Sequence, residues 1–186
     1  MIENSICIHF CEIVYHFRLY ENEYKPSQQG VCGITCNVNW PEPRDPNNDD
    51  DNDASETNLQ FNLGWFLHPI AVDGNYPSIM RKKIDAKSEA QGKYKKFSFT
   101  WIRRMGKYLY EKGDANTAIV LLIGFPESRL PSFKKEDSEE IVGSFDFIGI
   151  NFYTADIVFT KESDPNVVSY YADQDVSSYK VAIYNW

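Results

Sequence analysis

Histidine is scarce in this chain, and its few histidines are poorly placed to bind a metal. The 186 residues include three of them, His9, His16 and His68. None lies at zinc-ligand spacing from a pair of cysteines. The sequence therefore predicts no metal centre, and no motif in it indicates any other cofactor.

Long apolar runs are also absent. No stretch approaches the roughly 20 apolar residues that span a bilayer, so we expect no membrane span. The first segment, 1–10, contains Glu3 and His9 but neither a basic region nor a small-residue cleavage site, and is a poor signal peptide. Because no Asn-x-Ser/Thr sequon occurs, the sequence leaves the compartment open, and it also leaves the oligomeric state open.

Positive charge is the minority charge. The chain has 19 Lys and Arg against 27 Asp and Glu, a formal charge of -8, which argues against nucleic acid and anionic membranes as partners. Ten of the 19 basic residues nevertheless cluster between Arg81 and Lys107, mixed with aromatic residues. That mixture is typical of surfaces that bind phosphates and stack bases. Half of these charges fall on or beside a predicted helix, where they solvate its face, so we predict no nucleic-acid binding.

Cysteine is present in two pairs with the same spacing, Cys7 with Cys11 and Cys32 with Cys36. In a strand, four residues advance the chain about 13 Å at roughly 3.3 Å each, beyond the ~7 Å that a disulfide spans. We predict free thiols, and buried ones, because unpaired cysteine is among the most buried residue types.

Asp and Asn crowd one segment, 41–56, without forming a calcium loop. Counted from Asp49, the EF-hand pattern lacks its glycine, at Ala54, and its final glutamate, at Gln60. We expect a solvated loop that ends in helix-capping residues near 55–56.

Hydrophobic periodicity predicts alternating helices and strands, and hence an α/β fold in one domain. The predicted elements are a helix over 11–24, a strand over 31–40, a helix over 55–67 ended by His68-Pro69, a helix from 76–77 to 91–92, and a strand over 146–154. Glu139 and Glu140 fall in a further, surface helix.

Polar side chains follow the apolar part of both strands. Asn39 and Trp40 end the first strand, and Asn151 and Tyr153 end the second. In a parallel α/β barrel the C-terminal strand ends form the site, so these residues are candidate ligand contacts. The alternative is a core strand whose asparagine caps the next turn.

Four stretches resemble consecutive motifs of glycoside hydrolase family 1, which contains β-glucosidases, lactase-like enzymes and myrosinases. The stretches are FNLGWFLHPI at 61–70, GNYPSIM at 74–80, SRLPSF at 128–133 and DFIGINFYT at 146–154. The resemblance implies part of a (β/α)8 TIM barrel, from about strand 5 to just past strand 6. By this resemblance, residues 1–14 are an atypical N-terminal segment and 15–186 are the partial barrel.

The family resemblance also implies two catalytic glutamates, in Asn-Glu-Pro and Glu-Asn-Gly motifs, and this chain contains neither motif. Glu42, in Trp40-Pro41-Glu42-Pro43, resembles a second family Trp-x-Glu-Pro and not the catalytic one, so we assign no catalytic residue. Tyr153 matches the family tyrosine that hydrogen-bonds the nucleophile, and Asn151 matches the neighbouring site asparagine. Asn39 falls where relatives contact the aglycone or second sugar, with Trp40 beside it.

One segment departs from the family. Relatives pass from Ala-Gln-Gly, here ending at Gly92, almost directly to a segment like the one after Gly124, whereas 93–123 intervenes here. Its composition differs from both sides, so it is a retained intron in the gene model or a real inserted loop.

The expected function is that of a fragment of a family 1 β-glycosidase whose complete form acts on a β-glycoside. Since retaining hydrolysis needs two carboxyls, we expect this chain alone to be inactive. The alternative is a non-catalytic carbohydrate-binding or interaction protein derived from the barrel. The sequence does not give the sugar or the aglycone.

Overall fold

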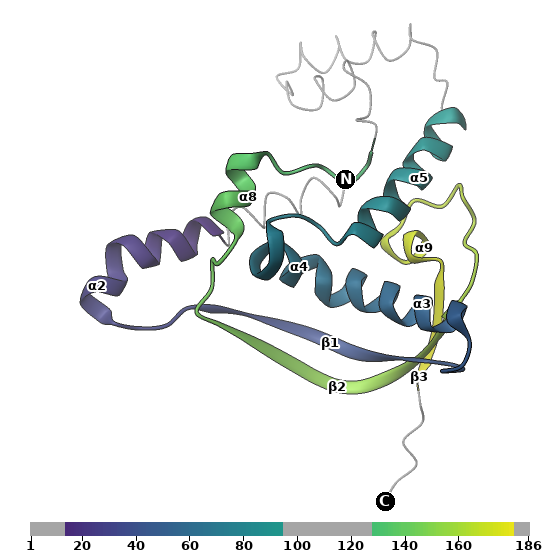
Figure 1. Cartoon of the computed structure of the whole chain (residues 1–186), viewed down its shortest axis with the longest axis horizontal. Helices are drawn as coiled ribbons and strands as arrows, with labels where there is room; N and C mark the ends of the chain where they lie inside the picture. Colours follow the sequence, from purple (N-terminus) through teal and green to yellow (C-terminus); the bar gives the residue numbers. More distant parts are fainter. Residues whose placement is uncertain (1–13, 95–127, 181–186) are drawn as a thin grey trace, which may run out of the picture.

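The structure, a computed structural model, describes residues 14–94 and 128–180 (Figure 1). The N-terminal segment with Cys7 and Cys11, and nearly all of the insert at 93–123, lie outside these residues. After a helical stretch at 14–19, the elements are η1 (Tyr20–Tyr24), α2 (Lys25–Gln28), β1 (Gly33–Pro43), α3 (Asp49–Leu59), η2 (Gln60–Gly64), α4 (Trp65–His68), η3 (Pro69–Asp73), α5 (Ser78–Tyr94), α8 (Lys135–Ile141), β2 (Phe147–Thr160), α9 (Tyr170–Gln174) and β3 (Val176–Lys180).

The sheet has the order β1-β2-β3. The strands β1 and β2 are parallel, from the pair Gly33 and Phe147 to the pair Pro43 and Val158, with one register shift after Val38. This parallel pair, with helices between its strands in sequence, gives the expected α/β fold. The strand β3 returns antiparallel to β2 and was not predicted.

The acidic segment is not the loop that the sequence predicted. Its helix α3 begins at Asp49, where Asn48 Oδ1 accepts hydrogen bonds from the backbone N–H groups of Asp50 and Asp51. Asp51 is buried, and its carboxylate forms an ion pair with Arg44, with Nε of Arg44 3.3 Å from Oδ2 of Asp51. The prediction of a helix start at 55–56 was wrong because the acidic residues stabilise a helix N-terminus, where partial positive charge favours them.

His68-Pro69 does not end this helix, contrary to the prediction. The chain stays helical from α3 to η3 and stops at Gly74, which takes a left-handed φ of 76°. Pro69 lies at the first position of η3, and this last helical segment closes with a hydrogen bond from Gly74 N to Pro69 O at 3.1 Å.

The other helical predictions are confirmed. Helix α5 begins directly after Pro77, as expected for a proline at a helix start. Helix α8 carries Glu139 on its solvated face. No helix in the described ranges is long and apolar enough to cross a membrane.

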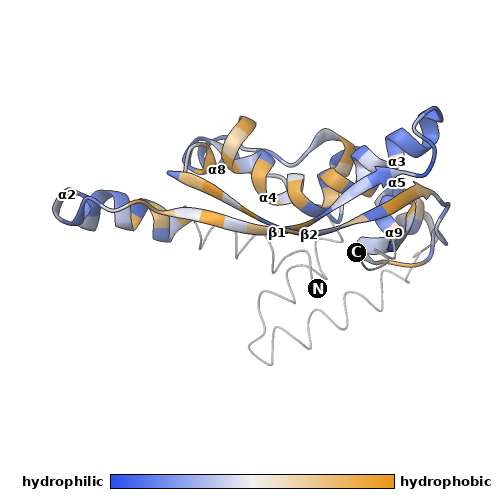
Figure 2. Cartoon of the chain, turned by 90° about the horizontal axis from the view of Figure 1, so that it is seen from below, coloured by the Kyte–Doolittle hydropathy of each residue, from blue (hydrophilic) through white to orange (hydrophobic). Residues whose placement is uncertain are grey.

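The core lies between the helices and one side of the sheet (Figure 2). Its larger cluster joins η2, α4 and α5 and contains Phe61, Trp65, Tyr76, Met80, Ile84 and Leu130. A second cluster brings Val14, Ile70 and Ile141 together, with Ile34 of β1 packed against it. Cys36 of β1 is buried and Cys32, just before β1, is half-buried, and both are free thiols. Burial raises the pKa of Cys36.

Ion pairs fasten the later segments to the helix layer. Arg129 donates two hydrogen bonds to the buried carboxylate of Asp173, at 2.7 and 3.0 Å. Lys87 of α5 donates to Asp175 Oδ1 at 2.6 Å, and Lys83 lies 3.5 Å from the other oxygen. The turn that joins α9 to β3 is therefore held against α5.

Candidate functional site

The two faces of β1 differ in what covers them. Ile34, Cys36 and Val38 alternate along the strand and face the helices, where Cys36 and Val38 are buried. Thr35 and Asn37 point to the opposite face, which is exposed. Side chains that can meet a ligand on the sheet therefore lie on the face opposite the helices.

Asn151 of β2 lies on that exposed face. It is the register partner of Asn37, and its Nδ2 donates a 2.9 Å hydrogen bond to Asn37 Oδ1. Tyr153 follows two residues later, which places it on the same face, and its side chain is 73% exposed. The structure thus brings two of the four predicted ligand contacts together with a third residue, Asn37.

The other two predicted contacts lie farther along β1. Asn39 does not reach Asn151; its Nδ2 donates to Asp156 Oδ2 at 3.0 Å, and the other oxygen of Asp156 is buried with no hydrogen-bond partner. Trp40 is the next residue on the strand, so its half-exposed ring points to the opposite face from Asn39. The register shift after Val38 separates this pair from the Asn151 pair.

The carboxylates on the two strands do not form a pair. Glu42 is in register with Ile157, whereas Asp156 is in register with Pro41. Because successive side chains alternate between faces, Glu42 and Asp156 point to opposite sides of the sheet. Within 14–94 and 128–180, no three His, Cys, Asp or Glu side chains gather as a metal site would require.

Sequence reasoning missed Asn37 and Asp156. Both sit two or more residues away from the predicted strand ends, and their partners depend on the β1–β2 register. The period-2 spacing of Asn37 and Asn39 was the one signal that could have indicated Asn37, since both belong to the same face.

The sequence model of glycosyl hydrolase family 1 matches residues 4–185. The chain belongs to this family. It is 32% identical to human lactase/phlorizin hydrolase over 162 residues, which cover 87% of this chain and 7% of that protein. It is 32% identical to myrosinase 1 of the aphid Brevicoryne brassicae over 150 residues, 81% of this chain and 25% of the myrosinase.

The fold comparison agrees. The solved structure of an aphid myrosinase superposes with a TM-score of 0.62 and 26% identity, covering 92% of this family 1 chain and 30% of the myrosinase. The family 1 chain thus spans at most about a third of each of these relatives, and its two parallel strands and helices are consistent with part of the family's barrel.

Proposed function

We propose that this chain is part of a family 1 β-glycosidase and that the exposed face of its sheet helps to bind a β-glycoside. Relatives named as lactase/phlorizin hydrolase, myrosinase and β-glucosidase support the substrate class. The observation that carries the proposal is the pair formed by Asn37 and Asn151, with Tyr153 exposed beside it on the face opposite the helices.

The chemistry of this face suits a sugar. The hydrogen bond from Asn151 to Asn37 fixes the amide of Asn151. The carbonyl oxygen and one N–H of that amide remain for sugar hydroxyls, and a hydroxyl can both donate and accept. The exposed phenol of Tyr153 can donate to a carboxylate, stabilise its charge and release it when a glycosyl bond forms. Asn39, held by Asp156, remains a candidate contact for the aglycone on this face, whereas Trp40, the other predicted contact, points to the opposite face.

We propose further that this chain alone does not hydrolyse glycosides. Retaining hydrolysis needs two carboxyl groups about 5 to 5.5 Å apart, one to attack and one to protonate the leaving oxygen. The family motifs that supply them do not occur in the sequence, and Glu42 and Asp156 point to opposite faces of the sheet. The candidate site therefore holds a substrate without the pair of acids that breaks its bond.

Turnover of a chromogenic β-glucoside by the purified chain tests this proposal. We expect no release of the chromophore above background. Turnover that survives Glu42→Gln would contradict our account of the missing carboxylates. Turnover that is lost in Glu42→Gln would return Glu42 to the list of catalytic candidates.

The second candidate function is a non-catalytic carbohydrate-binding or interaction protein derived from the barrel. The exposure of Asn151 and Tyr153 without a carboxylate pair favours it. Titration calorimetry with a simple glucoside separates the two: binding without turnover supports this candidate. Asn151→Ala should then weaken binding, whereas Asn166→Ala, in an exposed loop bonded only to Asp164, should leave it unchanged.

A further inference from the structure

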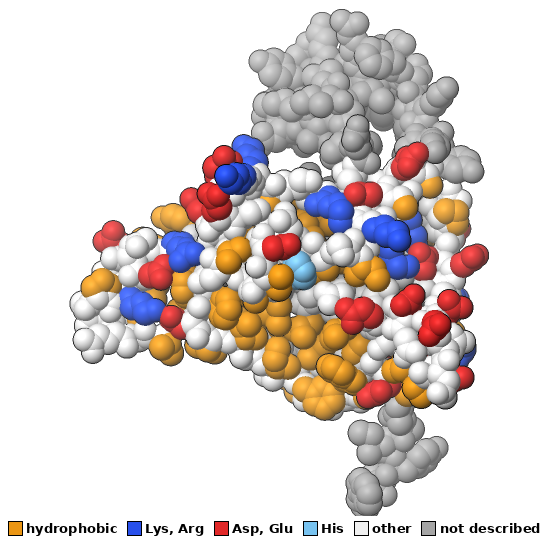
Figure 3. Space-filling view, in the orientation of Figure 1, with side chains coloured by type: hydrophobic (Ala, Val, Ile, Leu, Met, Phe, Trp, Pro, Cys, Tyr) orange, Lys and Arg blue, Asp and Glu red, His pale blue; other side chains and the backbone are white. Residues whose placement is uncertain are grey.

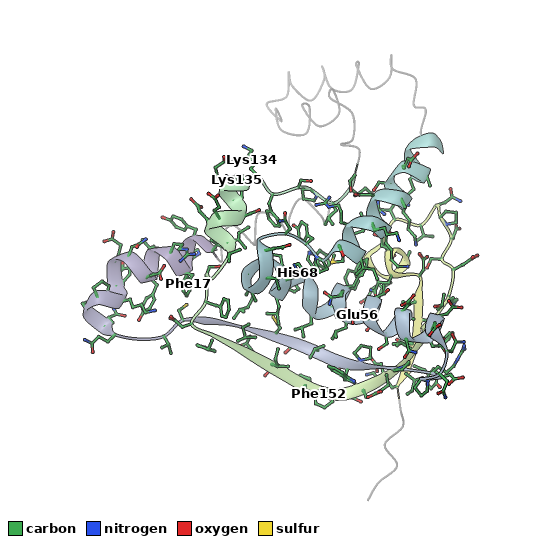
Figure 4. All side chains as sticks on the ribbon, viewed as in Figure 1. Phe17, Glu56, His68, Lys134, Lys135 and Phe152 are labelled. Atoms are coloured by element: carbon green, nitrogen blue, oxygen red, sulfur yellow. The ribbon has the colours of Figure 1, made fainter. Side chains whose placement is uncertain are left out.

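Asn37 and Asn151 form an amide pair across the two parallel strands. They are register partners, and Nδ2 of Asn151 donates to Oδ1 of Asn37 at 2.9 Å. In Figure 3 hydrophobic side chains gather over β1 and β2 below α4, and Phe152, labelled in Figure 4, follows Asn151 on β2. Because successive side chains alternate between faces, Phe152 points to the face opposite the amide pair. The pair therefore shares its exposed face with Tyr153.

An asparagine side chain has two chemically different ends. Its carbonyl oxygen only accepts hydrogen bonds, and its NH2 group only donates them. The torsion that exchanges the two ends is broad and roughly two-fold, so an isolated asparagine on a surface presents either end to a ligand. The hydrogen-bond partner of the amide therefore decides which end a ligand meets.

Asn37 is that partner for Asn151. Nδ2 of Asn151 is directed at β1, and the two ends of a planar amide point apart, so Oδ1 of Asn151 is directed away from β1. A neutral hydrogen bond contributes a net factor of about two to ten in an equilibrium, which is enough to favour this orientation over the reversed one. In the reversed orientation Asn37 would have to donate, so a side chain at this position that only accepts distinguishes the two.

We propose that Asn37 is a positioning residue that makes Asn151 present its carbonyl oxygen, so that the ligand hydroxyl at Asn151 has to act as a donor. The inference rests on the proposed binding of a β-glycoside for the identity of the ligand. It goes beyond that proposal by assigning the polarity of one contact and the residue that sets it. Asn37 acts through Asn151 and needs no contact of its own with the sugar.

Two variants of similar size test the orientation without any ligand. Asn37→Asp keeps an acceptor opposite Asn151 and removes the donor, whereas Asn37→Leu removes both. In the isotope-labelled chain, the Nδ2 protons of Asn151 should show nuclear Overhauser contacts to residue 37. These contacts should persist in Asn37→Asp and weaken about twofold or more in Asn37→Leu, because the amide then populates both orientations.

Methyl β-glucoside and its deoxyfluoro analogues test the polarity of the contact. Fluorine replaces one hydroxyl at a time and cannot donate a hydrogen bond. In the unchanged chain, one analogue should bind about tenfold more weakly than the parent glucoside, as measured by titration in the same spectra. This selectivity should persist in Asn37→Asp and fall to about threefold or less in Asn37→Leu, where Asn151 can turn its NH2 group towards the fluorine.

Two further variants serve as controls. Thr35→Asp adds the same negative charge to the same exposed face, two residues before Asn37, and should change neither the contacts of Asn151 nor the selectivity. Asn166→Ala alters an exposed turn and should also leave both unchanged. Circular dichroism confirms that each variant is folded.

Three results would overturn the inference. The first is a set of Asn151 contacts that ignores Asn37→Leu, and the second is their loss in Asn37→Asp. The third is equal selectivity in the unchanged chain and in Asn37→Leu, which would leave glucoside binding itself intact. If the contacts behave as expected but no glucoside binds, the proposed function fails and Asn37 keeps its role in orienting Asn151.

Discussion

Phe61 and Phe152 show how differently the two sides of this molecule are built. Phe61, at the helix layer, is 1% exposed and packs within the larger core cluster, whereas Phe152 on β2 is 59% exposed. Burying a phenylalanine contributes about 1.5–3 kcal/mol relative to leaving it in water. At these two positions the helix layer therefore gains stability from apolar burial that the β2 face does not gain.

The largest effect should come from breaking that contrast. Phe61→Ala leaves a cavity in the core and should lower the free energy of unfolding by about 3–5 kcal/mol. Phe152→Ala removes the same atoms from an exposed site and should cost less than about 1 kcal/mol. Urea unfolding of both variants measures the difference, and equal losses would show that the β2 face is already packed.

A second comparison lies within the sheet, between the Asn39–Asp156 pair and the Asn37–Asn151 pair. Asn39→Ala leaves the carboxylate of Asp156 without its donor, next to an oxygen that already has none, and should cost about 1–3 kcal/mol. Asn151→Ala breaks an exposed amide pair that water can replace, and should cost less than about 0.5 kcal/mol. If the two variants unfold at the same urea concentration, the buried setting of the Asp156 Oδ1 atom is wrong.

Acid should loosen the join between α5 and α9. Burial alone would raise the pKa of Asp175, but hydrogen bonds from Lys87 and the Ser163 N–H, together with the Lys83 charge, lower it. A lowered folded-state pKa gives stability that is fully present above the unfolded value of about 3.9 and is lost as the pH falls through the folded value. Asp175→Asn should thus cost on the order of 1 kcal/mol at pH 7 and progressively less below about pH 4.

Urea unfolding across that pH range measures the effect. The difference between the unchanged chain and Asp175→Asn should shrink in acid. Glu162→Gln removes a nearby carboxylate that is exposed and serves as the matched control. A difference that stays constant with pH would mean that Asp175 contributes through packing and not through its charge.

The sequence predicted the features whose signal lies within one element and missed those that depend on contacts between distant residues. Pro77 marked the start of α5, and the apolar run at 146–154 marked β2, because each signal lies within the element it describes. The start of α3 at Asp49 was missed because a run of acidic residues predicts a solvated loop. The sequence does not show that one of them, Asp51, pairs with Arg44. The strand β3 was missed because it is short and owes its place to pairing with β2.

The candidate site shows the same division. Asn151 and Tyr153 were indicated by polar residues that follow an apolar run, but the prediction that they end the strand was wrong, because β2 continues to Thr160. Asn151 bonds to Asn37 and not to Asn39, because the register of two strands more than a hundred residues apart decides which side chains meet. A single-residue change of register would exchange the two faces, so no reading of either strand alone predicts the pair.

The smallest effect should follow from the largest change in sequence. Described residues on either side of the insert are in contact: Arg129 N donates to Ser88 Oγ of α5 at 2.9 Å, and Arg81 donates to the carbonyl oxygen of Pro131 at 2.7 Å. Joining Gly92 to Gly124 by deleting 93–123 shortens the connection without removing these contacts. Since loop-closure entropy changes slowly with length, the free energy of unfolding should change by about 1 kcal/mol or less. A loss as large as that of Phe61→Ala would make the insert an integral part of the fold and not an addition to it.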